Sequence, residues 1–315
     1  MKTSEPVIWA IDPFEIETRP DAQLVEKLIS WIDASGFKLQ PVTVAETYAE
    51  RLGLGKSTEQ YLQSLGIQRF KKPLVLMDET SSRRGAVQKM IRFANRTRSP
   101  WIIVSSRGKS GIERLVLGSF SENLLRHSEI PVLFLTHFKS PHKQDENSKT
   151  AVFSTDFSTS SKEAFKQFLV NAKRFKMEVV LFYSVSLPSI GASGMGIASS
   201  IPLTYFSEQL KWAKEESLYW INLARAQGVE VRFIVKDEGI APCIGDSILK
   251  VADQESAALV VMASVSGPLA TFAVGSVARD VFRANRYPVW IYGTQSLANK
   301  KEHESTIQLA TESRV

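Results

Sequence analysis

The sequence has little cysteine and histidine, and this excludes several kinds of site. Its single cysteine, Cys243, stands among 315 residues and cannot form an internal disulfide. The four histidines are scattered, and no cysteine or histidine cluster has the spacing of metal ligands, so we expect no structural metal. Nothing pairs Cys243 with a base either. We interpret Cys243 as a packing residue and His127 as a surface or helix-capping residue.

Long apolar runs are also missing. No run approaches the roughly 20 residues that a transmembrane helix requires. The first residues lead directly into a strand-like segment, without the apolar region and cleavage site of a signal peptide. We therefore expect a cytoplasmic protein that has no membrane partner.

Positive charge is present in only modest excess. The net charge of +6 is small for this length, and the densest basic stretch, residues 69–98, has only two aromatic residues, Phe70 and Phe93, among its charges. Arg84, Arg92 and Arg96 fit the outer face of a helix. Its predicted inner face carries Val87, Met90, Ile91 and Ala94. We interpret the basic stretch as a solvated helix face and do not expect nucleic-acid binding.

An internal repeat is the most informative feature that is present. Residues 118–134 return as residues 275–291 without a gap, shifted by 157 positions. The identical residues are Gly118, Ser119, Arg126, Pro131 and Val132, which recur as Gly275, Ser276, Arg283, Pro288 and Val289. The chain is therefore a tandem duplication of two similar domains. Each copy places a Gly-Ser step at the start of a short amphipathic helix, whose free N–H groups favour an anion such as phosphate.

The repeat and the apolar pattern together predict the architecture. We expect one domain over residues 1–138, a polar linker over 139–149, a second domain over 150–293 and a polar tail over 294–315. Each copy has five short apolar runs that alternate with helical patterns. These predicted strands are 7–11, 39–44, 74–77, 102–104 and 132–135, then 152–153, 179–182, 231–235, 259–262 and 289–292. The alternation predicts an α/β fold with two doubly wound, parallel, five-stranded sheets. A stretch rich in glycine and serine, residues 188–200, is expected to form a mobile lid-like loop.

The loop after the fourth predicted strand carries a recognisable pattern, Ser105-x2-Gly108-x9-Gly118-Ser119. It resembles the universal stress protein family, whose nucleotide-binding members carry Gly-x2-Gly-x9-Gly followed by Ser or Thr. The resemblance covers nearly the whole chain, counted twice, as in tandem members of that family. It implies a Rossmann-like fold of the adenine-nucleotide alpha hydrolase type. Ser105 departs from the family pattern by placing a side chain where the family has glycine.

The resemblance also implies a ligand, an adenine nucleotide such as ATP or AMP, with or without Mg²⁺. Ser105, Gly108, Gly118, Ser119 and Ser121 would hold its phosphates and ribose in the first domain. Asp12 and its counterpart Asp156 would contact the adenosine portion, although an aspartate after a strand is also typical of a turn or helix cap. A backbone contact to the base would fall near Val44, and near Val185 in the second copy.

The second copy departs from the family motif. Gly275 and Ser276 keep the Gly-Ser step, but Ser266 stands in the place of a motif glycine and Pro268 removes a backbone N–H. We therefore expect nucleotide binding mainly in the first domain. We nominate no catalytic residue.

Two alternatives remain open at this stage. One is an interaction scaffold of the same fold that binds no nucleotide and acts through a protein partner that the sequence does not identify. The other is an ATP-consuming enzyme, although neither Asp12 nor Asp156 lies in the Ser-Gly-Gly-x-Asp-Ser loop that the pyrophosphatase members of the superfamily carry. Related proteins pair through their last strands, so Pro131–Leu135 and Pro288–Tyr292 are candidate edges for contact within the chain or for a homodimer.

One stretch imitates a different nucleotide motif. Gly53 to Ser57 contains the Gly-Lys-Ser of a P-loop, but position 50 is Glu50, where that motif requires glycine. We interpret Ser57 and Gln60 instead as a capping box at the start of a helix.

Overall fold

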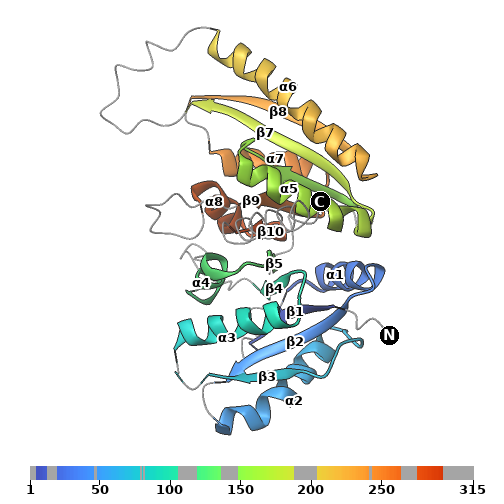
Figure 1. Cartoon of the computed structure of the whole chain (residues 1–315), viewed down its shortest axis with the longest axis vertical. Helices are drawn as coiled ribbons and strands as arrows, with labels where there is room; N and C mark the ends of the chain where they lie inside the picture. The colour runs from blue at the N-terminus through green and yellow to red at the C-terminus, as the bar shows by residue number, and fades with distance from the viewer. Residues whose placement is uncertain are drawn as a thin grey trace, which may run out of the picture.

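The strands of the chain pair edge to edge in one twisted sheet (Figure 1). The computed structural model describes residues 5–12, 20–45, 48–78, 80, 82–105, 119–135, 148–187, 204–240, 243–263 and 275–293. The first-half strands are β1 (Pro6–Ala10), β2 (Lys38–Ala45), β3 (Leu74–Met77), β4 (Ile102–Ser105) and β5 (Val132–Leu135). The second-half strands are β6 (Thr150–Ser154), β7 (Glu178–Leu187), β8 (Val231–Ile240), β9 (Leu259–Ala263) and β10 (Val289–Tyr292). The predicted strands are therefore confirmed, with ends that differ by a few residues.

The sheet has the order β3-β2-β1-β4-β5-β10-β9-β6-β7-β8, which divides into two five-stranded halves. Pairing within each half is parallel. The halves meet through an antiparallel pair in which Trp290 of β10 lies opposite Leu133 of β5. This confirms the predicted fold class and the predicted contact between the two last strands. Since β5 and β10 each have a neighbour on both sides, neither serves as an edge for a homodimer.

Helices cover both faces of the sheet (Figure 1). They are α1 (Ala22–Ala34), α2 (Tyr48–Ser64), α3 (Arg83–Arg96), α4 (Ser119–His127), α5 (Thr159–Phe175), α6 (Tyr205–Ala226), α7 (Ile244–Gln254) and α8 (Ser276–Ala284). Side chains alternate between the two faces of each strand. In β1, Val7 and Trp9 pack in one cluster with α1, α2, α5 and α6, whereas Ile8 packs in the other with α3, α4, α7 and α8. The molecule is a three-layer α/β/α sandwich.

Aromatic side chains fill the junction between the halves. Trp290 of β10 lies 5.0 Å from Trp101, which precedes β4, and 6.1 Å from Phe175 at the end of α5, measured between ring centroids. Phe175 in turn stacks on Trp31 of α1 at 5.8 Å. The α1 and α5 helices therefore meet over the β5–β10 pair, and one core runs through both halves.

Two interpretations of local sequence signals are wrong, and one is confirmed. Ser57 lies inside α2, so it caps no helix start, and the stretch from Gly53 is helical rather than a phosphate loop. Cys243 is exposed and occupies the N-cap position of α7 without a side-chain capping bond, so it is not a packing residue. The basic face of α3 is as predicted, with Arg84, Arg92 and Arg96 exposed. Its inner residues Val87, Met90, Ile91 and Ala94 are buried.

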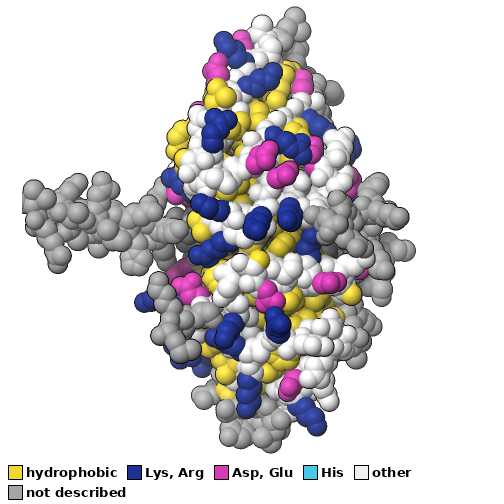
Figure 2. Space-filling view, turned by 90° about the vertical axis from the view of Figure 1, so that its right-hand side faces the viewer, with side chains coloured by type: hydrophobic (Ala, Val, Ile, Leu, Met, Phe, Trp, Pro, Cys, Tyr) yellow, Lys and Arg dark blue, Asp and Glu magenta, His cyan; other side chains and the backbone are white. Residues whose placement is uncertain are grey.

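Charged side chains are distributed over the face shown in Figure 2, among polar and hydrophobic atoms. Lysine and arginine gather in a band across its middle, with acidic side chains above and below, and hydrophobic atoms show in narrower strips between them. Large apolar side chains that are exposed in the described part of the chain lie on α5 and α6: Val170, Trp212, Leu218 and Tyr219. Among the described helices, none combines the length and the apolar character needed to cross a bilayer. The predicted lid, residues 188–200, the tail and most of the linker lie outside the described residues.

We expect the junction to dominate the stability of the chain. Trp290 is fully buried, so replacing it with alanine leaves a large cavity, and Trp290→Ala should lower the free energy of unfolding by about 3–5 kcal/mol. Urea denaturation followed by circular dichroism measures this change.

Leu218→Ala is the control, because 60% of the Leu218 side chain is exposed on α6. This variant should change the free energy of unfolding by no more than roughly 0.5 kcal/mol. A loss of less than about 1 kcal/mol in Trp290→Ala would contradict the assignment of the junction as the shared core.

Candidate functional site

The carboxyl edge of the first half brings two predicted site residues together. The strand order reverses between β1 and β4, and in open parallel sheets ligands bind beyond the strand ends at such a switch point. Ala10 of β1 lies opposite Val104 of β4. Asp12 follows β1 by two residues, and Ser105 is the last residue of β4, so both lie at this edge. Asp12 is exposed, and Ser105 is partly buried.

The amino end of α4 supplies backbone donors at the same end of the first half. The helix begins at Ser119 and leads into β5, which pairs in parallel with β4. Its first N–H groups have no partner within the helix and carry the positive end of the helix dipole. Ser121 in the first turn is buried, and Leu124 and Leu125 anchor the helix in the core below. The prediction that a short helix begins at Ser119 is confirmed.

Part of the predicted motif cannot be placed. Gly108 and Gly118 lie outside the described residues, and nothing is described of the side chain of Ser119. The predicted convergence of the two glycine-containing bends therefore stays a prediction. Val44 lies in β2, one residue before the strand ends, and is partly buried. Two residues earlier in β2, the Val42 carbonyl accepts a hydrogen bond from the Ile11 N–H (3.0 Å), which connects the end of β1 to β2.

In the second half, the carboxylate that corresponds to Asp12 is engaged in its own turn. The Ser158 N–H and the Ser161 hydroxyl donate to Asp156 Oδ1 at 2.9 and 2.5 Å. The Ser158 hydroxyl accepts from the Ser161 N–H (3.2 Å) and so caps α5. Burial would raise the pKa of Asp156, but the hydrogen bonds from Ser158 and Ser161 outweigh it and hold that pKa below its ordinary value. Asp156 therefore acts as part of a helix cap.

An aromatic side chain fills the space next to that turn. Phe157 has a positive φ of 57°, which is uncommon for a residue with a bulky side chain. Its ring lies 5.0 Å from Tyr183 of β7, 5.6 Å from Trp212 and 5.4 Å from Trp220 of α6, and 6.0 Å from Phe233 of β8. These contacts stabilise the uncommon backbone conformation.

The Phe157 cluster was not predicted from the sequence. Burial, followed by the charges of Tyr205 and Asp156, raises the pKa of Tyr183 above its ordinary value. The position of Phe157, directly after a strand-end aspartate, is the signal that could have identified it. Val185, the predicted counterpart of Val44, is buried in β7 next to an irregularity in the β7–β8 pairing.

The second Gly-Ser step has the predicted local structure. Gly275 is the N-cap of α8, with φ −59° and ψ 160°, and makes no side-chain capping bond. Ser276 is the first residue of the helix and is exposed. The step therefore leaves backbone donors at the amino end of α8, as it does in α4.

The described residues offer no ready metal site. Among them, no group of three or more His, Cys, Asp or Glu side chains could hold an ion.

Comparisons with known proteins place these observations in a family. The profile of the universal stress protein family matches residues 79–135 and 147–293. A universal stress protein of Methanocaldococcus jannaschii is 33% identical over 55 residues, which is 18% of this chain and 31% of that protein. The crystal structure of a universal stress protein from Archaeoglobus fulgidus covers 92% of this chain and 98% of its own, with a TM-score of 0.57 and 17% identity.

A further solved structure shows one ligand in a relative. A universal stress protein from the same organism, solved in complex with dAMP, covers 46% of this chain and 96% of its own, with 22% identity and a TM-score of 0.31. The dAMP is a ligand of the Archaeoglobus fulgidus protein. The family profile, in contrast, spans well over half of the present sequence and both of its halves, and the fold agrees along nearly the whole chain. The chain belongs to the universal stress protein family.

Proposed function

We propose that the chain binds one adenine nucleotide, ATP or AMP, at the carboxyl edge of its first half. It would act in the cytoplasm as a stress sensor or regulator rather than as a catalyst. One observation carries this proposal: Asp12 and Ser105 lie together at the β1–β4 switch point, and the amino end of α4 is in the same half. A carboxylate for hydroxyl or amine donors and backbone N–H groups for phosphates are the two kinds of contact that a nucleotide needs.

Each candidate residue has a role in this proposal. Asp12 would accept hydrogen bonds from the adenosine portion, and the backbone near Val44 would contact the base. Ser105, Gly108, Gly118, Ser119 and Ser121 would hold the phosphates and the ribose. Mg²⁺, where ATP carries it, would arrive with the phosphates.

The second half would keep the fold without binding a nucleotide. Two observations support this asymmetry: the Asp156 carboxylate is already engaged by Ser158 and Ser161, and the Phe157 ring packs beside it. Gly275 and Ser276 are then a remnant of the duplicated site. The proposed units are residues 1–138 and 150–293, joined by the linker 139–149.

A pair of matched variants tests which half binds. Gly118→Asp places a negative charge at the amino end of α4, where it repels phosphate, and should weaken ATP binding by about a hundredfold or more. Gly275→Asp makes the same change at α8 and should leave ATP affinity and a stoichiometry of one unchanged. Aspartate is a good N-cap, so the control variant should fold. Isothermal titration calorimetry with ATP and AMP measures both quantities.

Mass spectrometry of gently purified protein gives an independent test. Retained adenine nucleotide in the wild type supports the proposal. Its absence, together with a flat calorimetric titration, would sink the proposal and support a scaffold without nucleotide. Turnover of ATP that is lost in Gly118→Asp would overturn the regulatory role in favour of an enzyme.

The two equivalent aspartates should respond differently to the same substitution. Asp12→Asn should weaken ATP binding. Asp156→Asn should leave ATP binding unchanged and lower stability at pH 7 by roughly 0.5–1 kcal/mol, a small value because the side chain is more than a third exposed.

The pH dependence of stability has a definite sign. Because the folded-state pKa of Asp156 is lowered from 3.8, its contribution is present above that value and is lost as the pH falls through the folded pKa. Wild type and Asp156→Asn should therefore differ in urea unfolding at pH 7 and converge in strong acid. Equal stability of the two proteins at pH 7 would contradict the capping role.

A further inference from the structure

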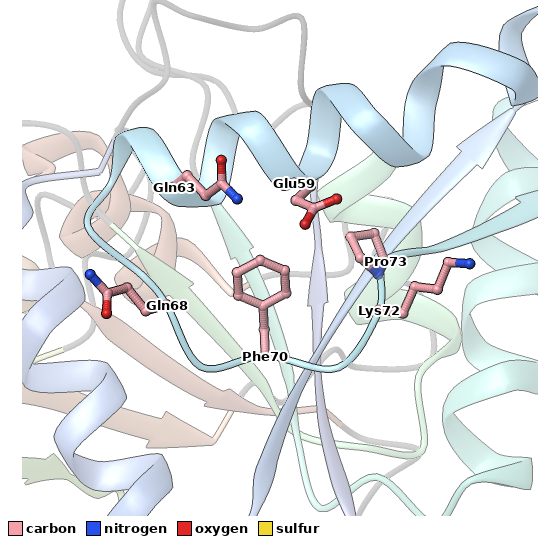
Figure 3. Close-up of a pocket in the computed structure, with 6 residues that line it drawn as sticks. All are labelled: Glu59, Gln63, Gln68, Phe70, Lys72 and Pro73. Atoms are coloured by element: carbon pink, nitrogen blue, oxygen red, sulfur yellow. The ribbon is translucent and has the colours of Figure 1, made fainter.

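A groove lies between the last turns of α2 and the segment that leads from this helix to β3 (Figure 3). Its volume is about 460 Å³, within the usual range for pockets that hold small molecules. The lining residues are Glu59, Gln63, Gln68, Phe70, Lys72 and Pro73. The groove lies at the outer end of the sheet, because β3 is its edge strand, and two strand positions separate β3 from β1 at the switch point. It is therefore distinct from the proposed nucleotide site.

The floor of the groove is fixed by hydrogen bonds along its length. The Ile67 N–H donates to the Leu62 carbonyl (3.1 Å) as the segment leaves α2, and the Lys71 N–H donates to the Leu39 carbonyl (2.8 Å). Near the other end, the Gln40 amide donates to the Lys72 carbonyl (3.0 Å). The groove is thus preformed, and a ligand would lose little free energy by ordering it.

The side chains of the groove combine an aromatic ring with a carboxylate. Glu59 and Gln63 are one helical turn apart on α2 and lie on the same side of the helix. Figure 3 shows the Phe70 ring rising from the segment toward them, with Pro73 next to Glu59 and the Lys72 amino group directed away from the ring. Phe70 is partly buried against the core.

The polar groups above the ring are available to a ligand. Within the described ranges, neither the Glu59 nor the Gln63 side chain has a hydrogen-bond or ion-pair partner. Glu59 and Lys72 are the two charged residues of the lining, and neither has an ion-pair partner among the described residues. Figure 3 shows the Glu59 carboxylate on the side of the Phe70 ring and the Lys72 amino group directed away from it, so the charge presented to a ligand above the ring is negative. A ring face and a carboxylate both attract cations, and the carboxylate repels anions.

We propose that this groove binds a small organic cation, an ammonium or guanidinium group carried on a short alkyl chain. The charged group lies over the Phe70 ring and donates hydrogen bonds to Glu59, with the Gln63 carbonyl as a second acceptor. The alkyl chain packs on Pro73 and the edge of Phe70. Such a ligand interacts at once with the Glu59 carboxylate, the Phe70 ring and the Gln63 side-chain amide. A neutral or anionic molecule of the same size cannot make all three interactions.

Agmatine, which has a guanidinium and an ammonium group on a four-carbon chain, is a suitable probe. Titration of the full chain by NMR or calorimetry should saturate with a Kd on the order of 1 mM at low salt, and binding should weaken as salt is added. Glu59→Gln keeps the shape and removes the charge, and should raise the Kd by roughly three- to tenfold. Phe70→Leu keeps an apolar floor without a ring, and should raise it about threefold.

Glu26→Gln is the matched control, since Glu26 is an exposed glutamate on another helix, α1. It should leave the Kd for agmatine unchanged. Butylurea, an uncharged analogue, should bind at least about threefold more weakly than agmatine. Unchanged thermal unfolding of Glu59→Gln shows that the variant is folded, because Glu59 is exposed on the surface of α2.

Three results would overturn the cation site: no saturation with agmatine, equal affinity in wild type and Glu59→Gln, or equal binding of butylurea. ATP titration of the same samples separates this outcome from a failure of the nucleotide proposal. Glu59→Gln should not change ATP affinity. Glu59 lies on α2, next to the edge strand β3, and not at the β1–β4 switch point.

Discussion

The antiparallel pairing of β5 with β10 is the constraint on which the rest of the molecule depends. Five parallel strands per half would otherwise leave two unpaired edges of buried apolar residues, and such edges associate unspecifically. Pairing them inside one chain removes both at once. It also fixes the short helices α4 and α8, because each leads into one of the paired strands after only a few residues. The positions of the two helix starts, at Ser119 and Ser276, therefore follow from the junction.

Short polar contacts lock these connections. After α4, the Ser128 hydroxyl donates to the Ile130 carbonyl (2.7 Å) and accepts from the Ile130 N–H (3.0 Å). After α8, Arg286 and Tyr287 both donate to the Asp253 carboxylate at the end of α7, at 2.6 and 2.5 Å. The two halves thus use different residues to hold the same geometry.

The junction also shows which physical effect dominates there. The indole N–H groups of Trp101 and Trp290 are buried, and neither has an acceptor among the described residues, which costs about 1–3 kcal/mol for each group. Burying the 150–250 Å² of a tryptophan side chain contributes about 4–6 kcal/mol at 25 cal/mol per Å². The free energy gained by burying each ring exceeds the cost of its indole N–H without an acceptor. Large aromatic side chains therefore stabilise this contact even though two of their N–H groups make no hydrogen bond among the described residues. The strands were readable from the sequence because strands buried on both faces are short apolar runs, and the repeat was readable from identical residues at a constant offset.

The local signals that failed did so for a physical reason. Ser57 has the sequence of a capping box, yet the helix continues through it, since packing of Leu54 and Leu62 against the sheet outweighs a capping preference of about 1 kcal/mol. Asp12 and Asp156 look alike in sequence, and only coordinates reveal that Ser158 and Ser161 engage Asp156. Phe157 illustrates the same limit, because its positive φ results from rings on β7, β8 and α6 that are distant in the chain.

Duplication explains why the two copies are alike in one region and unlike in another. Residues of the junction contact each other across the halves, as Val132 does with Ile291 and Val289 does with Phe134, so a change in one copy disturbs both. The identical pairs Pro131 and Pro288, and Val132 and Val289, lie in or next to these strands. The Phe157 ring, in contrast, contacts rings of its own half, on β7, α6 and β8. If the first half binds the nucleotide as we propose, one site per chain is enough, and the second half can carry the Phe157 aromatic cluster beside its capping turn without weakening the shared sheet.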